Sequence, residues 1–138
     1  MADFPASNAV RCDLVRIMIT ETADPQVIVL KERDGERCFP ILIGITEAIA
    51  IDRHVKGFEP QRPMTHDLLA GTIASLGGEV TRIEVCGLQD GTFYGKLVIE
   101  QDGRVVEVDS RPSDAIALAV RVDAPIYVSE DVLGEVCH

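Results

Sequence analysis

Alternating apolar and polar residues, interrupted by Asp-Gly pairs, run through much of this chain. Three such pairs, Asp34-Gly35, Asp90-Gly91 and Asp102-Gly103, each separate two strand-like runs. Asp-Gly supplies the positive φ angles that tight hairpin turns need. The pattern therefore predicts one hairpin and one three-strand meander, with strands over residues 27–32, 37–43, 80–88, 92–101 and 104–109.

The middle strand of the meander has one apolar face, formed by Phe93, Gly95, Leu97 and Ile99. Its other face is mixed, since successive strand residues point to opposite sides of the sheet. We expect that second face to be only half covered. Residues 14–20 and 126–128 are two further apolar runs and predict two more strands.

Three segments have the spacing of helices. Residues 46–56 stop before Gly57, a favourable residue just past a helix end. Residues 65–76 offer Thr65 as an N-cap and stop at a Gly-Gly pair, and residues 112–122 open with a proline at the first helical position. Residues 130–136 predict a last turn or two. The order of elements predicts an α+β fold, a mostly antiparallel sheet packed with about three helices.

Length and composition indicate a single compact domain over residues 1–138. A chain of 138 residues with 46% hydrophobic residues can bury one core, and no linker or low-complexity tract divides it. We expect an ordered core over about residues 12–134 and a frayed end over residues 1–10, which are small and polar.

The helix over 112–122 is apolar on nearly every side, which predicts that it is buried. Two acids, an arginine and two hydroxyls gather where it begins: Asp109, Ser110, Arg111, Ser113 and Asp114. In a functional interpretation, the helix amides, a serine hydroxyl and Arg111 bind a phosphate, while Asp109 or Asp114 holds a divalent ion. In a structural one, Asp114 complements the helix dipole and pairs with Arg111 across one turn. The spacing leaves both open.

A second polar group opens the helix over 65–76. His66 and Asp67 are consecutive, so in a helix they point about 100° apart and do not form a dyad. We expect a capped helix with a solvated histidine, although either residue could singly join a site at the other helix start. Glu47 and His54 share one face of the first helix, about 10 Å apart along its axis, and predict a polar face lining a cleft or a subunit contact.

Three runs, 62–69, 90–95 and 108–119, occur in this order and together resemble the bifunctional nuclease domain family over about residues 12–134. Plant members of that family are credited with cutting DNA and RNA. The resemblance implies a metal-dependent nuclease that hydrolyses phosphodiester bonds with Mg²⁺ or Mn²⁺. The resemblance does not assign catalytic residues. Within the nuclease hypothesis we expect Asp109 and Asp114 as metal-holding catalytic acids, Asp67 or Glu47 as a supporting acid, and Arg111, Arg62 and Ser113 as phosphate-binding residues.

The charge of the chain changes this picture. A net charge of −10 gives no basic face for stable, non-specific binding of nucleic acid. Only transient, metal-bridged contact with a nucleic-acid substrate fits it. The alternative is a non-catalytic homo-oligomeric module, a dimer by preference, that binds a partner protein or a small anionic ligand. A nuclease predicts three acids within about 5 Å of one another, and the module predicts Arg111 paired with its acids in a closed network.

The absence of several sequence motifs excludes further classes of protein. The sequence has no P-loop, dinucleotide-binding or nucleophile-elbow motif. Its apolar runs are too short to span a membrane and its start does not resemble a signal peptide, so we expect a cytoplasmic protein. The cysteines lack zinc spacing and are expected to be reduced, with Cys12, Cys38 and Cys86 buried and Cys137 exposed.

Overall fold

The computed structural model describes residues 8–20, 22 and 25–137. In these residues seven strands and four helices follow one another as β1 (Ala9–Met18), β2 (Gln26–Glu32), β3 (Cys38–Ile43), α1 (Ile45–Val55), α2 (Thr65–Ser75), β4 (Gly78–Gln89), β5 (Thr92–Gln101), β6 (Arg104–Ser110), α3 (Pro112–Val122), β7 (Ile126–Ser129) and α4 (Glu130–Val136). The expected frayed end is wrong at Ala9 and Val10, which pair with β7. Residues 1–7 lie outside the described part.

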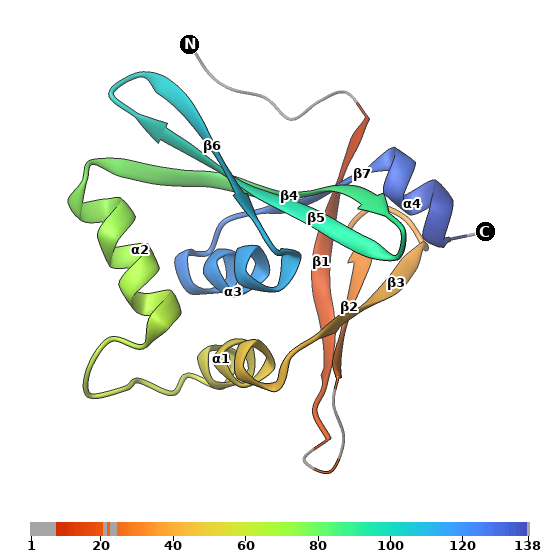
Figure 1. Cartoon of the computed structure of the whole chain (residues 1–138), viewed down its shortest axis with the longest axis horizontal. Helices are drawn as coiled ribbons and strands as arrows, with labels where there is room; N and C mark the ends of the chain where they lie inside the picture. Colours follow the sequence, from red (N-terminus) through yellow and green to blue (C-terminus); the bar gives the residue numbers. More distant parts are fainter. Residues whose placement is uncertain (1–7, 21, 23–24, 138) are drawn as a thin grey trace.

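All seven strands form one sheet in the order β3-β2-β1-β7-β4-β5-β6. Every neighbouring pair is antiparallel except β7 and β4, which run parallel. The short strand β7 therefore joins the β1–β3 half to the β4–β6 half. Figure 1 shows the two halves crossing steeply, with α1, α2 and α3 gathered together and α4 at the far side. The predicted α+β class with dominant antiparallel pairing is confirmed.

Two of the three Asp-Gly turns have the predicted backbone conformation, with positive φ angles at both residues. Asp90 and Gly91 have φ angles of 52° and 78°, and the pair at 102–103 is similar. At Asp34 and Gly35 neither φ is positive, so the tight turn expected there is wrong although the hairpin is correct. Its longer loop is closed instead by Arg37, whose Nε lies 2.6 Å from Glu32 Oε1.

The helix ends follow from local capping. At the end of α1, Gly57 adopts a φ of 79°, Gly57 N donates to His54 O and Phe58 N donates to Arg53 O. These two bonds form a Schellman motif, which fixes Phe58 beside the last turn of the helix. The predicted N-cap Thr65 is wrong: α2 begins at Thr65, and Asp67 closes its first turn by accepting the N–H of Met64 at 3.0 Å.

The structure has four helices in its described part rather than about three. The additional one is α4, where the sequence predicted only a last turn or two. Ser129 caps it, since its Oγ accepts the N–H of Asp131 at 3.2 Å. Val132 and Leu133 of α4 are buried in the core, which stabilises this short helix by packing.

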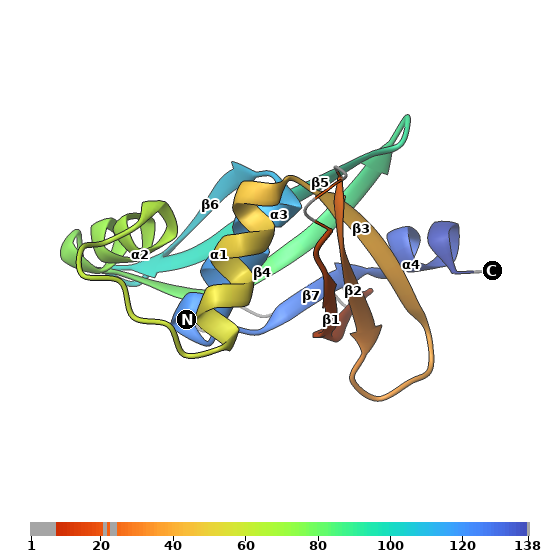
Figure 2. The same cartoon turned by 90° about the horizontal axis from the view of Figure 1, so that it is seen from below.

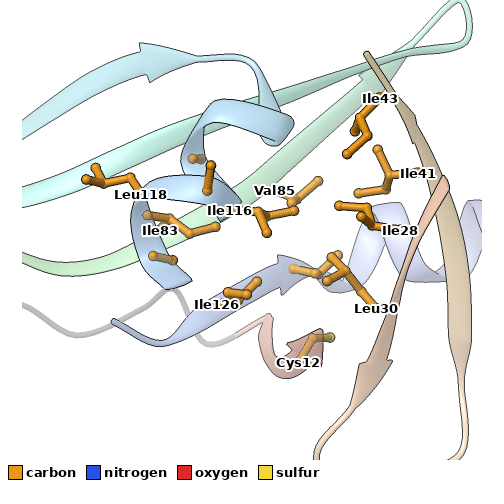
Figure 3. Packing of buried hydrophobic residues seen from close by; sticks show 14 of the residues in the cluster. Cys12, Ile28, Leu30, Ile41, Ile43, Ile83, Val85, Ile116, Leu118 and Ile126 are labelled. Atoms are coloured by element: carbon orange, nitrogen blue, oxygen red, sulfur yellow. The ribbon is translucent and has the colours of Figure 1, made fainter. Parts of the chain in front are cut away.

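The core fills the space between the sheet and α3 (Figure 3). Five consecutive residues of α3, 115–119, are buried, which confirms the predicted burial of this helix. The sheet contributes aliphatic side chains from both halves, among them Ile28, Leu30, Ile83 and Val85. A helix that is buried on nearly all sides cannot shift without opening the core.

The predicted environment of the cysteines is correct only for Cys12, whose burial raises its pKa to about 12. Cys38 and Cys86 are exposed, because strand alternation places them opposite the core-facing residues. Cys137, expected to be exposed, is partly buried, and its Sγ donates to Cys38 O at 3.3 Å. All four thiols are free.

The sheet exposes apolar side chains on its outer surface. Leu42 of β3 is 64% exposed and Met18 of β1 is 42% exposed, and both pair with Val27 between them. On the meander, the outer face is half covered as expected, with Val98 buried and Tyr94 exposed. Self-association stays a prediction. Among the described residues, no helix is long and apolar enough to cross a membrane.

Gly95 lets the start of α3 lie directly on β5. A Cβ at this position would come within 3.2 Å of Pro112 Cα and N, both backbone atoms at the first turn of α3. We expect Gly95→Ala to lower the free energy of unfolding by about 1–3 kcal/mol, because a packed core yields little space. Urea denaturation measures this loss.

The matched control for this prediction is Gly87→Ala in the adjacent strand. A Cβ there would have its nearest contact at an ordinary 3.8 Å, to Tyr94. Equal loss of stability in the two variants would show that the approach of Pro112 is not the cause.

Candidate functional site

Helices α1, α2 and α3 enclose a cavity of about 320 Å³. Its polar lining comes from all three helices: Glu47, Arg53 and His54 on α1, His66 and Asp67 on α2, and Arg111, Asp114 and Arg121 at and along α3. Both histidines that the structure describes face this cavity. Figure 2 shows α1 lying along α3, with α2 to one side, and both α1 and α2 pack against α3.

Arg111 links α1 to the start of α3. Its Nε donates to Asp114 Oδ2 at 2.9 Å, and its Nη1 lies 3.3 Å from Glu47 Oε1. Glu47 is buried, and Gly44 leaves room for it, since a Cβ on Gly44 would lie 3.0 Å from Glu47 Oε1. The hydrogen bond from Arg111 to Asp114, with the nearby charges of both acids, raises the pKa of the guanidinium, which therefore stays charged.

His66 lies against Asp114 and not against its sequence neighbour. Its Nε2 is 3.0 Å from Asp114 Oδ1, across 48 residues of chain. The expected solvated histidine is wrong, because the His66 side chain is only 12% exposed. The expectation that His66 and Asp67 form no dyad is confirmed, and His66 joins the other helix start singly. Asp114 thus accepts from Arg111 with one oxygen and contacts His66 with the other.

Asp67 makes a second link between α2 and α3. Its Oδ1 accepts from Arg121 Nε at 2.7 Å, while its Oδ2 accepts the backbone N–H of Met64. The Met64 bond first, and Arg121 second, lower the pKa of Asp67 below its usual value. The contacts Glu47–Arg111, His66–Asp114 and Asp67–Arg121, which join charged or titratable side chains of these helices, each have one end at α3.

Asp109 does not lie in this cavity. It pairs with Lys96 across β5 and β6, so the two side chains share one face of the sheet. The preceding residue, Gly95, faces Pro112 of α3, and Lys96 therefore points to the opposite face. The structure separates Asp109 from Asp114, which the sequence placed together.

Two of the proposed phosphate ligands lie near the cavity but outside its lining. Arg62 lines an adjoining hollow that shares His54, Asp67 and Arg121 with the cavity. Ser113 is buried and lines a separate hollow towards β3. Arg111 is the one of the three predicted phosphate ligands that lines the cavity itself.

The residues expected to hold a divalent ion do not form a ligand set. Asp109 and Asp114 point to different sides of the sheet, and Arg111 lies between Glu47 and Asp114. Within the part of the chain that the structure describes, no three His, Cys, Asp or Glu side chains gather as a metal site would require. Arg111 is paired with Asp114 and Glu47, as in the network that the ligand-binding alternative predicts, but Asp109 is not part of it.

Sequence reasoning missed Arg121 and the aromatic wall of the cavity. Arg121 follows Asp114 by seven residues, two helical turns, so the spacing alone places both on one face of α3. Phe58 lines the cavity with the guanidinium of Arg53 at 5.2 Å from its ring centroid. Phe58 directly follows Gly57, the predicted end of α1, and this position was the sequence signal that could have placed its ring beside the helix.

Comparisons with known proteins agree with the three motifs. The bifunctional nuclease domain matches residues 28–138 of this chain. An uncharacterized protein of Mycobacterium tuberculosis, Rv1829, is 42% identical over 122 residues, which cover 88% of this chain and 73% of that protein. Bifunctional nuclease 1 of Arabidopsis thaliana is 27% identical over 116 residues, covering 81% of this chain and 36% of the plant protein. Bifunctional nuclease 2 of Oryza sativa subsp. japonica is 29% identical over 114 residues, 80% of this chain and 35% of its own length.

Asp67 makes the stability of the protein depend on pH. Its pKa is lowered in the folded state, so its stabilisation is present above the unfolded pKa near 3.9 and is lost as the pH falls through the folded value. We expect Asp67→Asn to reduce the free energy of unfolding at pH 7 by roughly 0.5–2 kcal/mol, and the difference from the wild type to vanish in acid. Thermal denaturation from pH 7 to pH 3 measures this.

The control is Asp102→Asn, in a turn where φ is 51° and asparagine is equally tolerated. The carboxylate of Asp102 makes no ion pair with the described residues. A pH-independent loss in Asp67→Asn, or the same pH dependence in Asp102→Asn, would contradict the role assigned to Asp67.

Proposed function

This chain belongs to the bifunctional nuclease domain family, and we propose that it hydrolyses phosphodiester bonds of nucleic acid in the cavity between α1, α2 and α3. The observation that carries the proposal is the contact between His66 and Asp114 beside Arg111. It puts a proton-transfer group, its orienting acid and a cation in one cavity. The relatives named as bifunctional nucleases supply the reaction class.

His66 is the group that moves a proton. Asp114 holds one nitrogen of the imidazole ring, which fixes the orientation of the ring. The other nitrogen then takes a proton from an attacking water molecule or returns one to the leaving oxygen. The mostly buried position of His66 restricts competing contacts with solvent.

Arg111 binds the phosphate. A guanidinium has five N–H donors, and the contacts with Asp114 and Glu47 leave some of them available. The Arg111 side chain is 66% exposed, so these donors are accessible to a ligand. Its charge neutralises a phosphate oxygen locally, which suits a protein of net charge −10 that lacks a wide basic face.

A divalent ion, Mg²⁺ or Mn²⁺, stays part of the proposal as a requirement to be tested. No step above passes through it, because Asp109 and Asp114 do not converge. Cleavage assays therefore include each metal and a chelator as separate conditions.

The second candidate is a non-catalytic domain that binds a small anion or an anionic partner at Arg111. The observation that favours it is the closed network, in which Arg111 already contacts Glu47 and Asp114. This candidate predicts anion binding without cleavage, whereas the nuclease predicts both.

Cleavage of single-stranded DNA and RNA by purified protein tests the proposal. We expect Asp114→Asn to reduce the rate at least about 100-fold, because proton transfer by a positioned side chain contributes roughly 10²–10⁴-fold. Asp109→Asn is the matched variant, since it makes the same chemical change on the opposite face of the sheet. We expect it to keep the wild-type rate.

The cleavage rates of the wild type and the two variants distinguish three outcomes. Loss in Asp114→Asn alone supports the cavity as the active site. Loss in Asp109→Asn alone, or equal loss in both with the fold intact by circular dichroism, contradicts this placement. Cleavage that is absent from the wild type under every metal condition contradicts the nuclease and leaves the anion-binding domain.

A further inference from the structure

The cavity also has apolar lining residues. Ile49, Ala50, Phe58, Pro60, Met64 and Ala117 line it beside the polar residues already described. The volume of the cavity, about 320 Å³, lies within the range of sites that bind small molecules, which span about 300–1,000 Å³, and its lining combines apolar and charged side chains.

Phe58 is the aromatic residue of this lining. Its side chain is 51% exposed although it is a large apolar ring, while Phe39 and Phe93 pack against each other inside the protein. The Schellman motif at Gly57 holds Phe58 next to Arg53, whose guanidinium lies 5.2 Å from the ring centroid. Arg53 Nη1 also lies 4.0 Å from Met64 Sδ.

An exposed aromatic ring beside an arginine is a stacking surface for a planar group. Nucleobases stack on such rings and on guanidinium groups, and this stacking depends little on which base is present. The half-exposed ring is accessible from solvent, and a base can stack on it only with a face that its neighbours in the strand do not cover.

Arginine side chains line this cavity in an otherwise acidic protein. Arg53, Arg111 and Arg121 line it, and Arg62 lines the adjoining hollow. Glu47 and Asp114 already contact Arg111, and Asp67 contacts Arg121. So few cations, partly balanced by acids, suit one phosphate and not the many phosphates of an extended duplex.

We propose that the cavity binds a single unstacked nucleotide, with its base on the surface formed by Phe58 and Arg53 and its phosphate at Arg111. This inference rests on the proposed function and deepens it by naming the ligand as one nucleotide unit. Phe58 is then a binding residue that touches the base. The protein accepts nucleic acid one exposed nucleotide at a time, at free ends or unpaired positions.

Calorimetric titration of the full chain with adenosine monophosphate and with ribose 5-phosphate, in chelator, tests this inference. The two ligands share the phosphate and sugar and differ by the base. We expect adenosine monophosphate to bind about 5- to 150-fold more tightly, the range given by the stacking of one base on one aromatic side chain. We expect Phe58→Ala to bring the two affinities together and to leave the affinity for ribose 5-phosphate unchanged.

Leu68→Ala is the control, since it removes an exposed apolar side chain of α2 that lies outside the cavity lining. It is expected to keep the preference for adenosine monophosphate. Equal binding of the two ligands by the wild type, or an unchanged preference in Phe58→Ala at unchanged melting temperature, would overturn the inference.

Cleavage of single-stranded RNA, measured on the same wild-type preparation, distinguishes this inference from the function on which it rests. Cleavage without a Phe58-dependent preference leaves the nuclease standing and overturns the nucleotide site. A Phe58-dependent preference without cleavage under any metal condition supports the nucleotide site and overturns the nuclease.

Discussion

The burial of α3 is the constraint on which the rest of the structure depends. Residues 115–119 are enclosed by the sheet, α1 and α2, and Gly95 allows the first turn of the helix to touch β5. Because α3 cannot move without opening the core, it fixes Arg111, Asp114 and Arg121 in space. Helix α1 contributes Glu47, and α2 contributes His66 and Asp67, and each of these side chains meets one of the three, so the cavity forms where the packing of α3 places it.

The fold could be predicted where local chemistry decides it. Pro112 at the first helical position, Gly57 past the end of α1 and the glycines at 91 and 103 each mark a boundary that the structure confirms. The Asp34-Gly35 turn shows the limit, because the loop beyond it is longer and an arginine closes it. The place of β7 in the middle of the sheet was not predictable, since a four-residue strand carries no local mark of its partners.

In the candidate site too, local contacts could be predicted from the sequence and long-range contacts could not. Arg111 and Asp114 are one helical turn apart, and the sequence predicted their pairing as one of two interpretations. His66 meets Asp114 across 48 residues, a contact that arises only from the packing of α2 against α3. Asp109 is close to Asp114 in sequence but lies on the other face of the sheet, because the strand ends between them. Proximity in sequence was therefore a poor guide to convergence in space.

A double-mutant cycle on His66 and Asp114 tests the central claim most directly, since the claim is that these two side chains act as a unit. The cleavage rates of wild type, His66→Gln, Asp114→Asn and the double variant are compared at one pH. When two residues act as a unit, the effects of their substitutions on the rate are strongly non-additive. The account predicts a double variant about as slow as the slower single variant; a loss equal to the product of the two single losses would contradict it.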